Sequence, residues 1–187
     1  AIPLAFLGLA CFVVSSLLLL VLLFVAVYIL LNSALLVTLQ ALGCSASFRV
    51  CAEVVQRARP DAKLWVGIPT WPNHIPLMGS AGFEIEDYPY YDKTTHSINI
   101  DAMMETLNRV PAGDVVVLHG CCPNPTGADL QPEHWGQIAD IALEREVIPF
   151  NDIAYQGFGQ GLEGEAYGMR MMAERLRELL VAVSCSK

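Results

Sequence analysis

The chain has 187 residues and a net charge of −8, from 11 Lys and Arg against 19 Asp and Glu. This length is sufficient for one domain with a hydrophobic core, and an acidic chain without a basic cluster is a poor candidate for nucleic-acid binding. The six cysteines form no regular framework, and the adjacent Cys121 and Cys122 fit neither a disulfide staple nor a CxxC metal knuckle. We therefore expect reduced thiols, as in a cytoplasmic protein, with no metal site and no nucleic-acid partner.

Residues 1–37 form a hydrophobic segment that differs from the rest of the chain, since every charged residue lies at or after Arg49. The apolar run from Ala10 to Val37 exceeds the roughly 20 residues that span a bilayer, so hydropathy alone predicts a transmembrane or signal-anchor helix. No Lys or Arg flanks the run to set an orientation, and a secretory signal would have a basic start. A membrane or buried segment and a frame-shifted stretch are both open alternatives, so this segment does not decide the function.

Residues 38–187 alternate between helical and strand patterns and form the second predicted region. In chain order we expect a helix over 45–58, strands over 63–70 and 83–91, a helix over 101–110, a strand over 114–120, a helix over 132–146, a strand over 147–155, a helix over 169–180 and a strand over 181–185. The continuous apolar run at 114–120 is typical of a strand buried on both faces. This rhythm predicts an α/β fold with a mostly parallel sheet flanked by helices.

In a parallel sheet of this kind, ligands bind beyond the carboxyl ends of the strands. Polar residues follow four of the expected strands, at 71–74, 119–124, 152–155 and 184–187. A lysine amine can form a Schiff base with an aldehyde such as pyridoxal phosphate (PLP). That cofactor also needs a carboxylate at its ring nitrogen, donors for its phenolate oxygen, an aromatic surface and a helix N-terminus for its phosphate. Each requirement has a candidate in this chain.

Four motifs in these segments, "IPTWPNH", "CCPNPTGADLQPEHW", "NDIAYQGF" and "SCSK", carry a resemblance to a known family. In their order and approximate spacing they resemble class I aminotransferases of the aspartate/aromatic type, which are fold type I PLP enzymes. The resemblance covers residues 38–187 and not 1–37. It implies a partial PLP-binding large domain, and exchange of an amino group between an aspartate or aromatic amino acid and a 2-oxo acid such as 2-oxoglutarate. It also implies a homodimer.

The resemblance implies catalytic roles for three residues and roles in holding the cofactor ring for two more. Lys187 would be the Schiff-base lysine and would carry the proton to and from the substrate. Asp152 would pair with the ring nitrogen through a charge-assisted bond. Asn124 and Tyr155 would hydrogen-bond the phenolate oxygen, and Trp71 would stack on the ring.

The resemblance also implies a phosphate site and a supporting shell. Cys44, Ser45 and Ser184 would hold the phosphate, the first two at a helix start, while His74 and His119 would lie behind the residues that touch the cofactor, with His74 behind the aspartate. Taken singly, each of these residues has a structural explanation, such as a solvated lysine, a turn-capping aspartate or a packed histidine. Their joint occurrence favours the functional interpretation.

Several positions depart from the family pattern. Glycine is usual in the family where Cys44 and Ala46 stand, and a side chain there could crowd the approach to phosphate. Pro123 replaces a frequent histidine, and Asn151 stands where the family has an apolar strand residue, at a cost in free energy unless it is hydrogen-bonded. The family continues past the lysine into arginines that bind phosphate and substrate. We therefore expect this chain to be a fragment with little activity alone.

Two other functions compete with this interpretation. The stretch from Ser184 to Lys187 also fits S-x-x-K, the nucleophile motif of penicillin-binding proteins and serine β-lactamases. That motif belongs at a helix start, however, whereas Ser184 follows an expected strand. The second alternative is a membrane-anchored or partner-binding protein that keeps an aminotransferase-like sheet without catalysis.

Overall fold

The computed structural model of this chain describes residues 37–186, so nearly all of the expected hydrophobic segment at 1–37, and also Lys187, lie outside the described residues. Within the described part, no helix is both long enough and apolar enough to span a membrane. The residues from Gln40 onward form one compact unit. That unit carries all of the helices and strands described below.

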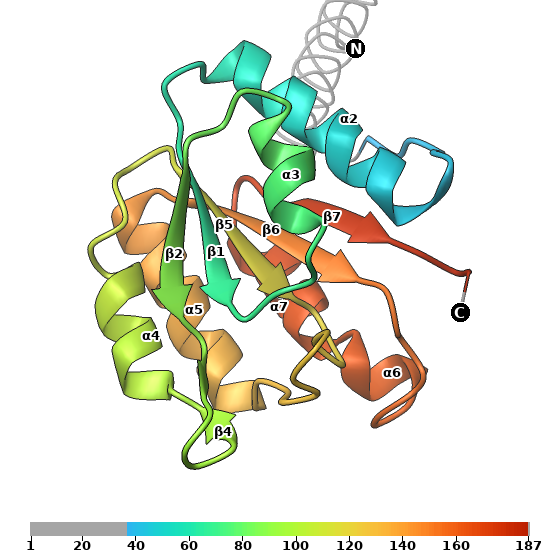
Figure 1. The fold of residues 1–187 in the computed structure, drawn as a ribbon. Coiled ribbons are helices and arrows are strands. Elements are labelled where there is room, and N and C mark those ends of the chain that lie inside the picture. Colours follow the sequence, from blue (N-terminus) through green and yellow to red (C-terminus); the bar gives the residue numbers. More distant parts are fainter. Residues whose placement is uncertain (1–36, 187) are drawn as a thin grey trace, which may run out of the picture. The chain divides into compact units, whose positions relative to one another are not determined.

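A five-stranded parallel sheet forms the centre of this unit, as the alternating pattern predicted (Figure 1). All four neighbouring strand pairs are parallel. Across the sheet the strands run in the order β2 (Ile85–Pro89), β1 (Leu64–Ile68), β5 (Val115–His119), β6 (Ile148–Ile153) and β7 (Leu180–Val183). Valine and leucine make up β5 up to His119, and every residue of β6 is buried, as expected of strands covered on both faces.

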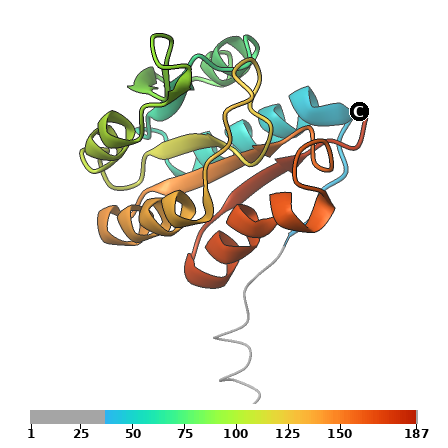
Figure 2. The same cartoon turned by 90° about the horizontal axis from the view of Figure 1, so that it is seen from below.

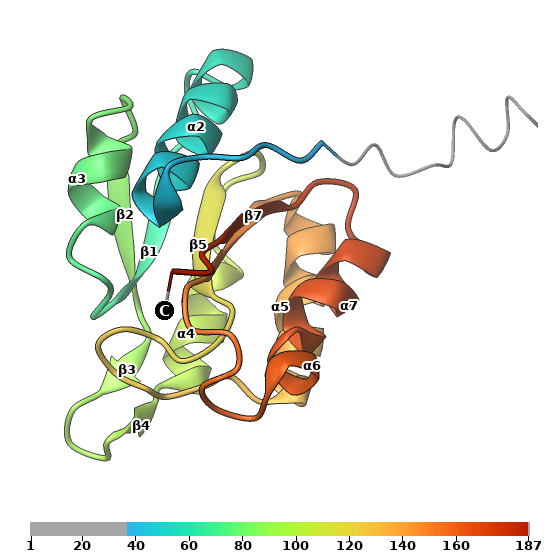
Figure 3. The same ribbon diagram turned by 90° about the vertical axis from the view of Figure 1, so that its right-hand side faces the viewer.

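Helices cover both faces of the sheet (Figures 2 and 3). One face packs against α2 (Gly43–Ala58) and α3 (His74–Gly79), and its core contains Phe48, Met78 and Phe150. The other face packs against α4 (Ile100–Leu107), α5 (Pro132–Arg145) and α7 (Tyr167–Arg175), and its core contains Met103, Trp135 and Met172. The short α6 (Leu162–Glu165) precedes α7, and β3 (Tyr91–Asp92) pairs with β4 (Ser97–Ile98) in a separate antiparallel ribbon.

The structure shifts one of the expected helices and adds two short ones. The helix expected at 169–180 instead spans Tyr167–Arg175, because Leu176 adopts an extended backbone with ψ of 148° and the last strand begins at Leu180. The short helices α3 and α6 were not expected from the pattern, since they offer too few residues for a helical period. None of these changes moves a strand end away from the predicted edge of the sheet.

The strand register places the candidate residues side by side at that edge. His119 at the end of β5 lies opposite Asp152 in β6, and Asp152 lies opposite Ala182 in β7. The carboxyl ends of parallel strands share one edge, which is where ligands bind in open α/β sheets. The site is therefore sought where β5, β6 and β7 end.

Candidate active site

A hollow of about 360 Å³, including its open mouth, lies at the carboxyl edge of the sheet. Residues from α2, from the ends of β5 and β6, and from the loops after β1, β5 and β6 line it: Cys44, Trp71, His119, Cys121, Cys122, Asn124, Asp152, Ala154 and Tyr155. Chain segments far apart in sequence therefore converge on one cavity, as the strand order requires.

Asp152 supplies a buried carboxylate to this hollow. Asp152 is 5% exposed, and its Oδ2 lies 3.0 Å from Nε2 of the fully buried His74. The Cys44 thiol donates to the other oxygen, Oδ1, at 3.3 Å. A buried carboxylate is costly unless it is bonded, and these contacts meet that requirement while leaving the residue on the wall of the cavity.

A hydrogen-bonded chain of side chains extends behind the carboxylate. The Thr70 hydroxyl lies 2.6 Å from His74 Nδ1 and 3.0 Å from His119 Nε2, so it joins the two imidazoles. This connection fixes the orientation of the His74 ring and hence of Asp152. Hydrogen-bond partners orient the histidines of metal sites in the same way. His119 Nδ1 is 4.0 Å from Asp152 Oδ2, so the second histidine also faces the acid.

His119 is held in its neutral form. Burial lowers its pKa, and the neighbouring His74 lowers it further, against the opposing effect of Asp152, so that the pKa is about 4. Its side chain is only 8% exposed, which explains why loss of solvation is the dominant cause. The site therefore contains a neutral imidazole beside a carboxylate at neutral pH.

Aromatic rings enclose the His74 side of the network. The rings of Phe48 and His74 lie 4.7 Å apart, and the edge of Trp71 meets His74 at 5.3 Å and 89°. This apolar surround excludes water from the acid–histidine pair and strengthens its electrostatics. Trp71 also lines the hollow, so one wall of the cavity is aromatic.

Of the three residues expected to hold the phosphate, Cys44 lines the hollow, whereas Ser45 and Ser184 do not. The helix α2 begins at Gly43, whose φ of 79° is one that glycine adopts freely, and Cys44 follows it on the wall of the hollow. Ser45 is exposed at the same helix start, and Ser184 lies just past β7, where its backbone N–H donates to Ile153 O at 2.9 Å. Neither serine lines the hollow.

Six of the ten predicted residues line the hollow together: Cys44, Trp71, His119, Asn124, Asp152 and Tyr155. His74 lies behind Asp152 as expected, whereas Lys187 lies outside the described residues. Sequence reasoning did not single out Thr70, although it stands in the "IPTWPNH" motif, and it did not place Cys121 and Cys122 on the cavity wall. The signal for Thr70 was its position one residue after a strand-ending proline and four before the histidine that it bonds.

The S-x-x-K alternative finds no support in the backbone. The described part of that motif, residues 184–186, continues from the end of β7 without helical structure. A nucleophile of the S-x-x-K type stands at a helix start, which Ser184 does not. The Ser184 hydroxyl is instead 2.8 Å from that of Ser186.

The chemistry of the donor set fits a pyridoxal ring. A buried carboxylate suits a cationic ring nitrogen, and a tryptophan wall suits the face of an aromatic ring. An amide from Asn124 and a phenol from Tyr155 provide donors on the same cavity for a ring oxygen. The residues present therefore match the requirements of this cofactor for its ring.

Comparisons with known proteins agree with this geometry. Residues 31–187 match the family described as aminotransferase class I and II, a match that begins slightly before residue 38. The chain is 43% identical over 166 residues to a tyrosine aminotransferase of Klebsiella pneumoniae, covering 89% of this chain and 42% of the relative. It is 43% identical over 150 residues to an aspartate aminotransferase of Escherichia coli (strain K12), covering 80% of this chain and 38% of the relative. The chain thus spans about two-fifths of the length of these relatives.

Solved structures show the same fold at similar identity. An aromatic amino acid aminotransferase from Burkholderia cenocepacia superimposes with a TM-score of 0.78 at 44% identity, covering 80% of this chain and 37% of that one. An aromatic-amino-acid aminotransferase from Burkholderia pseudomallei, covalently bound to pyridoxal phosphate, gives 0.77 at 41% identity over 79% and 37% of the two chains. With a parallel sheet, a cavity at its carboxyl edge and a match over most of its residues, this chain belongs to the class I and II aminotransferase family.

Proposed function

We propose that this chain carries part of the cofactor-binding domain of a PLP-dependent aminotransferase. The reaction is exchange of an amino group between an aspartate or aromatic amino acid and a 2-oxo acid such as 2-oxoglutarate. The observation that carries the proposal is the buried Asp152, which His74 holds at 3.0 Å on the wall of the hollow. A carboxylate in that position is the group that a pyridine nitrogen needs to remain protonated.

Bound PLP supplies an electron sink for the charge that develops at the substrate α-carbon. Asp152 would hold a proton on the ring nitrogen, and His74 with Thr70 keeps the carboxylate oriented. Asn124 and Tyr155 would donate hydrogen bonds to the phenolate oxygen, and Trp71 would cover one face of the ring. Preorganised partners of this kind cost no reorganisation during the reaction.

Three residues complete the proposed cofactor site. Cys44 and Ser45 lie at the start of α2, and the N-terminus of a helix favours a phosphate, while Ser184 follows the end of β7. Of these three side chains only Cys44 lines the hollow, so a phosphate held by all three would extend beyond it. His119 contacts the Thr70 hydroxyl and through it helps to orient His74.

Lys187 is proposed as the amine that bonds the aldehyde carbon of the cofactor. With the cofactor bound, the same amine would carry the proton to and from the substrate α-carbon. The assignment rests on the "SCSK" motif after β7, whose strand neighbour is the one that carries Asp152. A strand adjacent to the acid is the position from which a lysine reaches the same ring.

We also propose a cytoplasmic homodimer that acts on amino acids and 2-oxo acids. The relatives include a tyrosine, an aromatic and an aspartate aminotransferase, which supports these substrate classes. The five described cysteines form no disulfide, as expected in a reducing compartment. The oligomeric state is testable by analytical ultracentrifugation of the chain with and without PLP.

Borohydride labelling tests the proposal directly. The chain contains three lysines, Lys63, Lys93 and Lys187. After mixing with PLP we expect an absorbance band in the near-visible region that disappears on borohydride reduction, and peptide mapping should then find the added mass on Lys187. The Lys187→Ala variant should lose the band, whereas the variant of the exposed Lys93, Lys93→Ala, should keep it. Labelling spread equally over the three lysines would overturn the assignment.

A further inference from the structure

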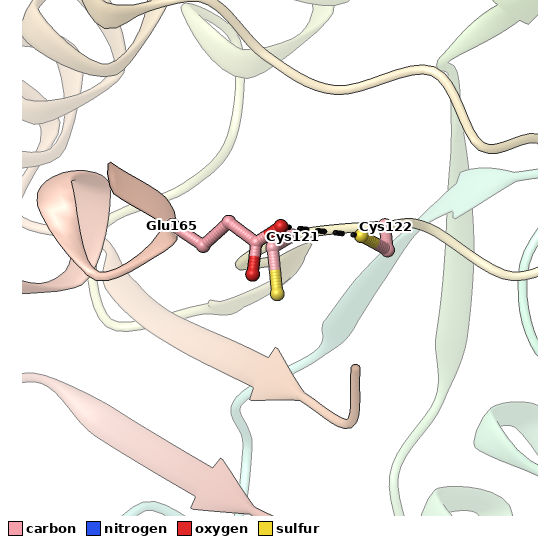
Figure 4. A group of neighbouring side chains, drawn as sticks. All are labelled: Cys121, Cys122 and Glu165. Carbon is pink, nitrogen blue, oxygen red and sulfur yellow. Dashed lines mark hydrogen bonds between the residues drawn. The ribbon is translucent and has the colours of Figure 1, made fainter. Parts of the chain in front are cut away.

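A cluster of sulfur and oxygen ligands lies beside the proposed cofactor site. Cys121 and Cys122 follow β5, and Glu165 ends α6 some 43 residues further along. One ligand atom from each residue lies within 4.8 Å of the other two, and Cys122 Sγ is 3.7 Å from Glu165 Oε1. Figure 4 shows the Glu165 side chain directed at the two cysteines.

A second carboxylate belongs to the same cluster. Asp129 Oδ1 accepts the Cys122 backbone N–H at 2.6 Å. A β-carbon added at Gly159 would lie 2.5 Å from Glu165 Oε1, 3.3 Å from Cys122 Sγ and 3.7 Å from Asp129 Oδ2. Three potential ligand atoms, two from the loop between β5 and α5 and one from α6, therefore surround one point beside Gly159.

No described basic side chain balances these groups. The ion pairs of residues 37–186 include neither Asp129 nor Glu165. Burial raises the pKa of the Cys121 thiol to about 12, with further contributions from Cys122, Glu165 and Asp129. Burial also raises the pKa of Asp129. In both groups burial is the main cause, and the negative charge of Glu165 adds to it.

Glu165 is the most firmly placed member of the cluster. Burial acts to raise its pKa, but backbone N–H donors from Gly157, Gly159 and Gln160 outweigh burial and hold the pKa below its ordinary value. The carboxylate is therefore ionised and fixed in orientation. A carboxylate has about four acceptor positions. Oε1 accepts the N–H groups of Gly159 and Gln160, and Oε2 accepts that of Gly157, so Oε2 keeps a position for a ligand bond.

The distances suit a small tetrahedral cation. Zinc bonds of about 2.3 Å to sulfur and about 2.1 Å to oxygen place neighbouring ligand atoms about 3.5 to 3.8 Å apart. The observed 3.7 Å between Cys122 Sγ and Glu165 Oε1 already meets this value. The other separations among the ligand atoms of Cys121, Cys122 and Glu165 are within 4.8 Å, so they need to shorten by about 1 Å at most. Cys122 has a φ of 43°, a left-handed conformation uncommon outside glycine, as is often seen at functional sites.

We propose that Cys121, Cys122 and Glu165, with Asp129 as the fourth ligand, bind one thiophilic divalent cation such as Zn²⁺ or Cd²⁺. Each thiol that bonds the cation releases its proton to solvent, so affinity rises with pH. Because both cysteines also line the hollow, the cation would sit against one wall of the cofactor site. The sequence does not reveal this site, because Asp129 and Glu165 lie well after the adjacent cysteines in the chain.

Titration with Cd²⁺ tests the proposal on the reduced, full 187-residue chain. We expect one ion per chain bound at this site, a thiolate-to-metal charge-transfer band in the ultraviolet, and proton release into a weakly buffered solution. Binding should tighten by at least about tenfold between pH 6 and pH 8, because protons compete for the thiols. Affinity that is independent of pH would contradict thiolate ligation.

Alkylation mapping of the unaltered chain avoids any effect of mutation on folding. With saturating Cd²⁺, iodoacetamide should modify Cys121 and Cys122 much more slowly, while Cys51 and Cys185 should react as they do without metal. Equal reaction of the adjacent pair with and without Cd²⁺ would overturn the proposal. Protection that moves instead to Cys44 would also overturn it, since that result would place the ion in the hollow.

Matched variants then identify the ligands. Cys122→Ser and Glu165→Gln should each weaken Cd²⁺ binding at least about tenfold. The controls are Cys185→Ser, an exposed thiol, and Glu163→Gln, an exposed carboxylate on the same helix that pairs with Arg170. Circular dichroism of each metal-free variant establishes that it is folded, and ligand variants that are folded yet bind like the controls would refute the assignment.

Discussion

Two neighbouring residues of β6, Asn151 and Asp152, have opposite environments. Successive side chains of a strand point to opposite faces of the sheet. Asp152 faces α2 and α3, where His74 and Cys44 both contact its oxygens. Asn151 faces α7, where its Nδ2 contacts Met172 Sδ at 3.8 Å and its Oδ1 has no hydrogen-bond partner among the described residues.

Asp152 is a buried polar residue that belongs to the candidate site, whereas Asn151 is a buried polar residue that only lowers stability. Asp152 is 5% exposed and Asn151 is 0% exposed, so both side chains lost their hydration on folding. On the Asp152 face a connected network replaces that hydration, whereas on the Asn151 face a sulfur is a poor substitute. We therefore expect substitutions on the first face to impair binding or stability, and a substitution on the second to improve stability.

The largest expected effect is the pH dependence contributed by His119, which belongs to the Asp152 network. Its pKa is lowered to about 4 in the folded chain, against about 6.5 when unfolded. Between these values the unfolded chain binds a proton that the folded chain does not. The free energy of unfolding is therefore highest above pH 6.5 and falls on acidification, by up to about 3 kcal/mol near pH 4.

Urea unfolding at pH 7 and pH 4 measures this contribution. The variant His119→Gln removes the titrating group while its amide can still bond Thr70, so it should lose less stability on acidification than the unaltered chain. The exposed His96, changed to glutamine, is the matched control and should behave as the unaltered chain does. Identical losses in all three proteins would show that His119 does not titrate as described.

The next effect is on cofactor affinity and concerns the carboxylate itself. Asp152→Asn keeps the size of the side chain and a bond to His74 but removes the charge that holds a proton on the ring nitrogen. A charge-assisted bond contributes about 1.5 to 3 kcal/mol, so PLP should bind about 10- to 100-fold more weakly. Fluorescence or absorbance titration with PLP measures the change.

Asp114→Asn is the control for that substitution. Asp114 is also a buried aspartate, but it precedes β5 at the opposite edge of the sheet, where it accepts bonds from the Lys63 backbone and the Trp65 indole. Its variant should bind PLP with unchanged affinity. Equal weakening in both variants would mean that general destabilisation, and not the ring nitrogen, explains the effect.

A smaller effect is expected from the hydroxyl that joins the two histidines. Thr70→Val keeps the shape of the side chain but removes the partner of His74 Nδ1 and His119 Nε2. Leaving buried groups unpaired should lower the free energy of unfolding by about 1 to 2 kcal/mol. In the control Thr106→Val, the lost hydroxyl bonds only the backbone of its own helix, and the cost should stay below about 0.5 kcal/mol.

The sequence was sufficient to predict the part of the fold that follows from periodicity. The runs "DVVVLHG" and "VIPFNDIAY" are apolar enough to be central strands, and parallel strands bring His119 and Asp152 to one edge. The departure at Asn151 was also visible, and its missing partner confirms that the position is costly. These predictions needed only local pattern and the rule that ligands bind at the carboxyl ends of the strands.

What escaped prediction depends on contacts between distant segments. Thr70 matters because its hydroxyl contacts two imidazoles from different elements. Its position four residues before His74 indicates at most the first of these contacts, and nothing in the sequence indicates the contact with His119. The grouping of Glu165 with the adjacent cysteines likewise arises across 43 positions, through a loop whose backbone the carboxylate holds. Side-chain geometry of this kind follows from tertiary structure and not from spacing.

The smallest effect has the opposite sign and tests the other face of β6. Asn151→Leu replaces an amide whose oxygen lacks a partner with an apolar side chain of similar size beside Met172. Removing the buried, unpaired group should raise the free energy of unfolding by about 1 kcal/mol, measured by urea denaturation. Asn108→Leu, at the exposed end of α4, should change it by less than about 0.5 kcal/mol. A loss of stability in Asn151→Leu would show that the Asn151 amide is hydrogen-bonded. The two faces of β6 would then differ in the charge of the buried side chain and not in its hydrogen bonding.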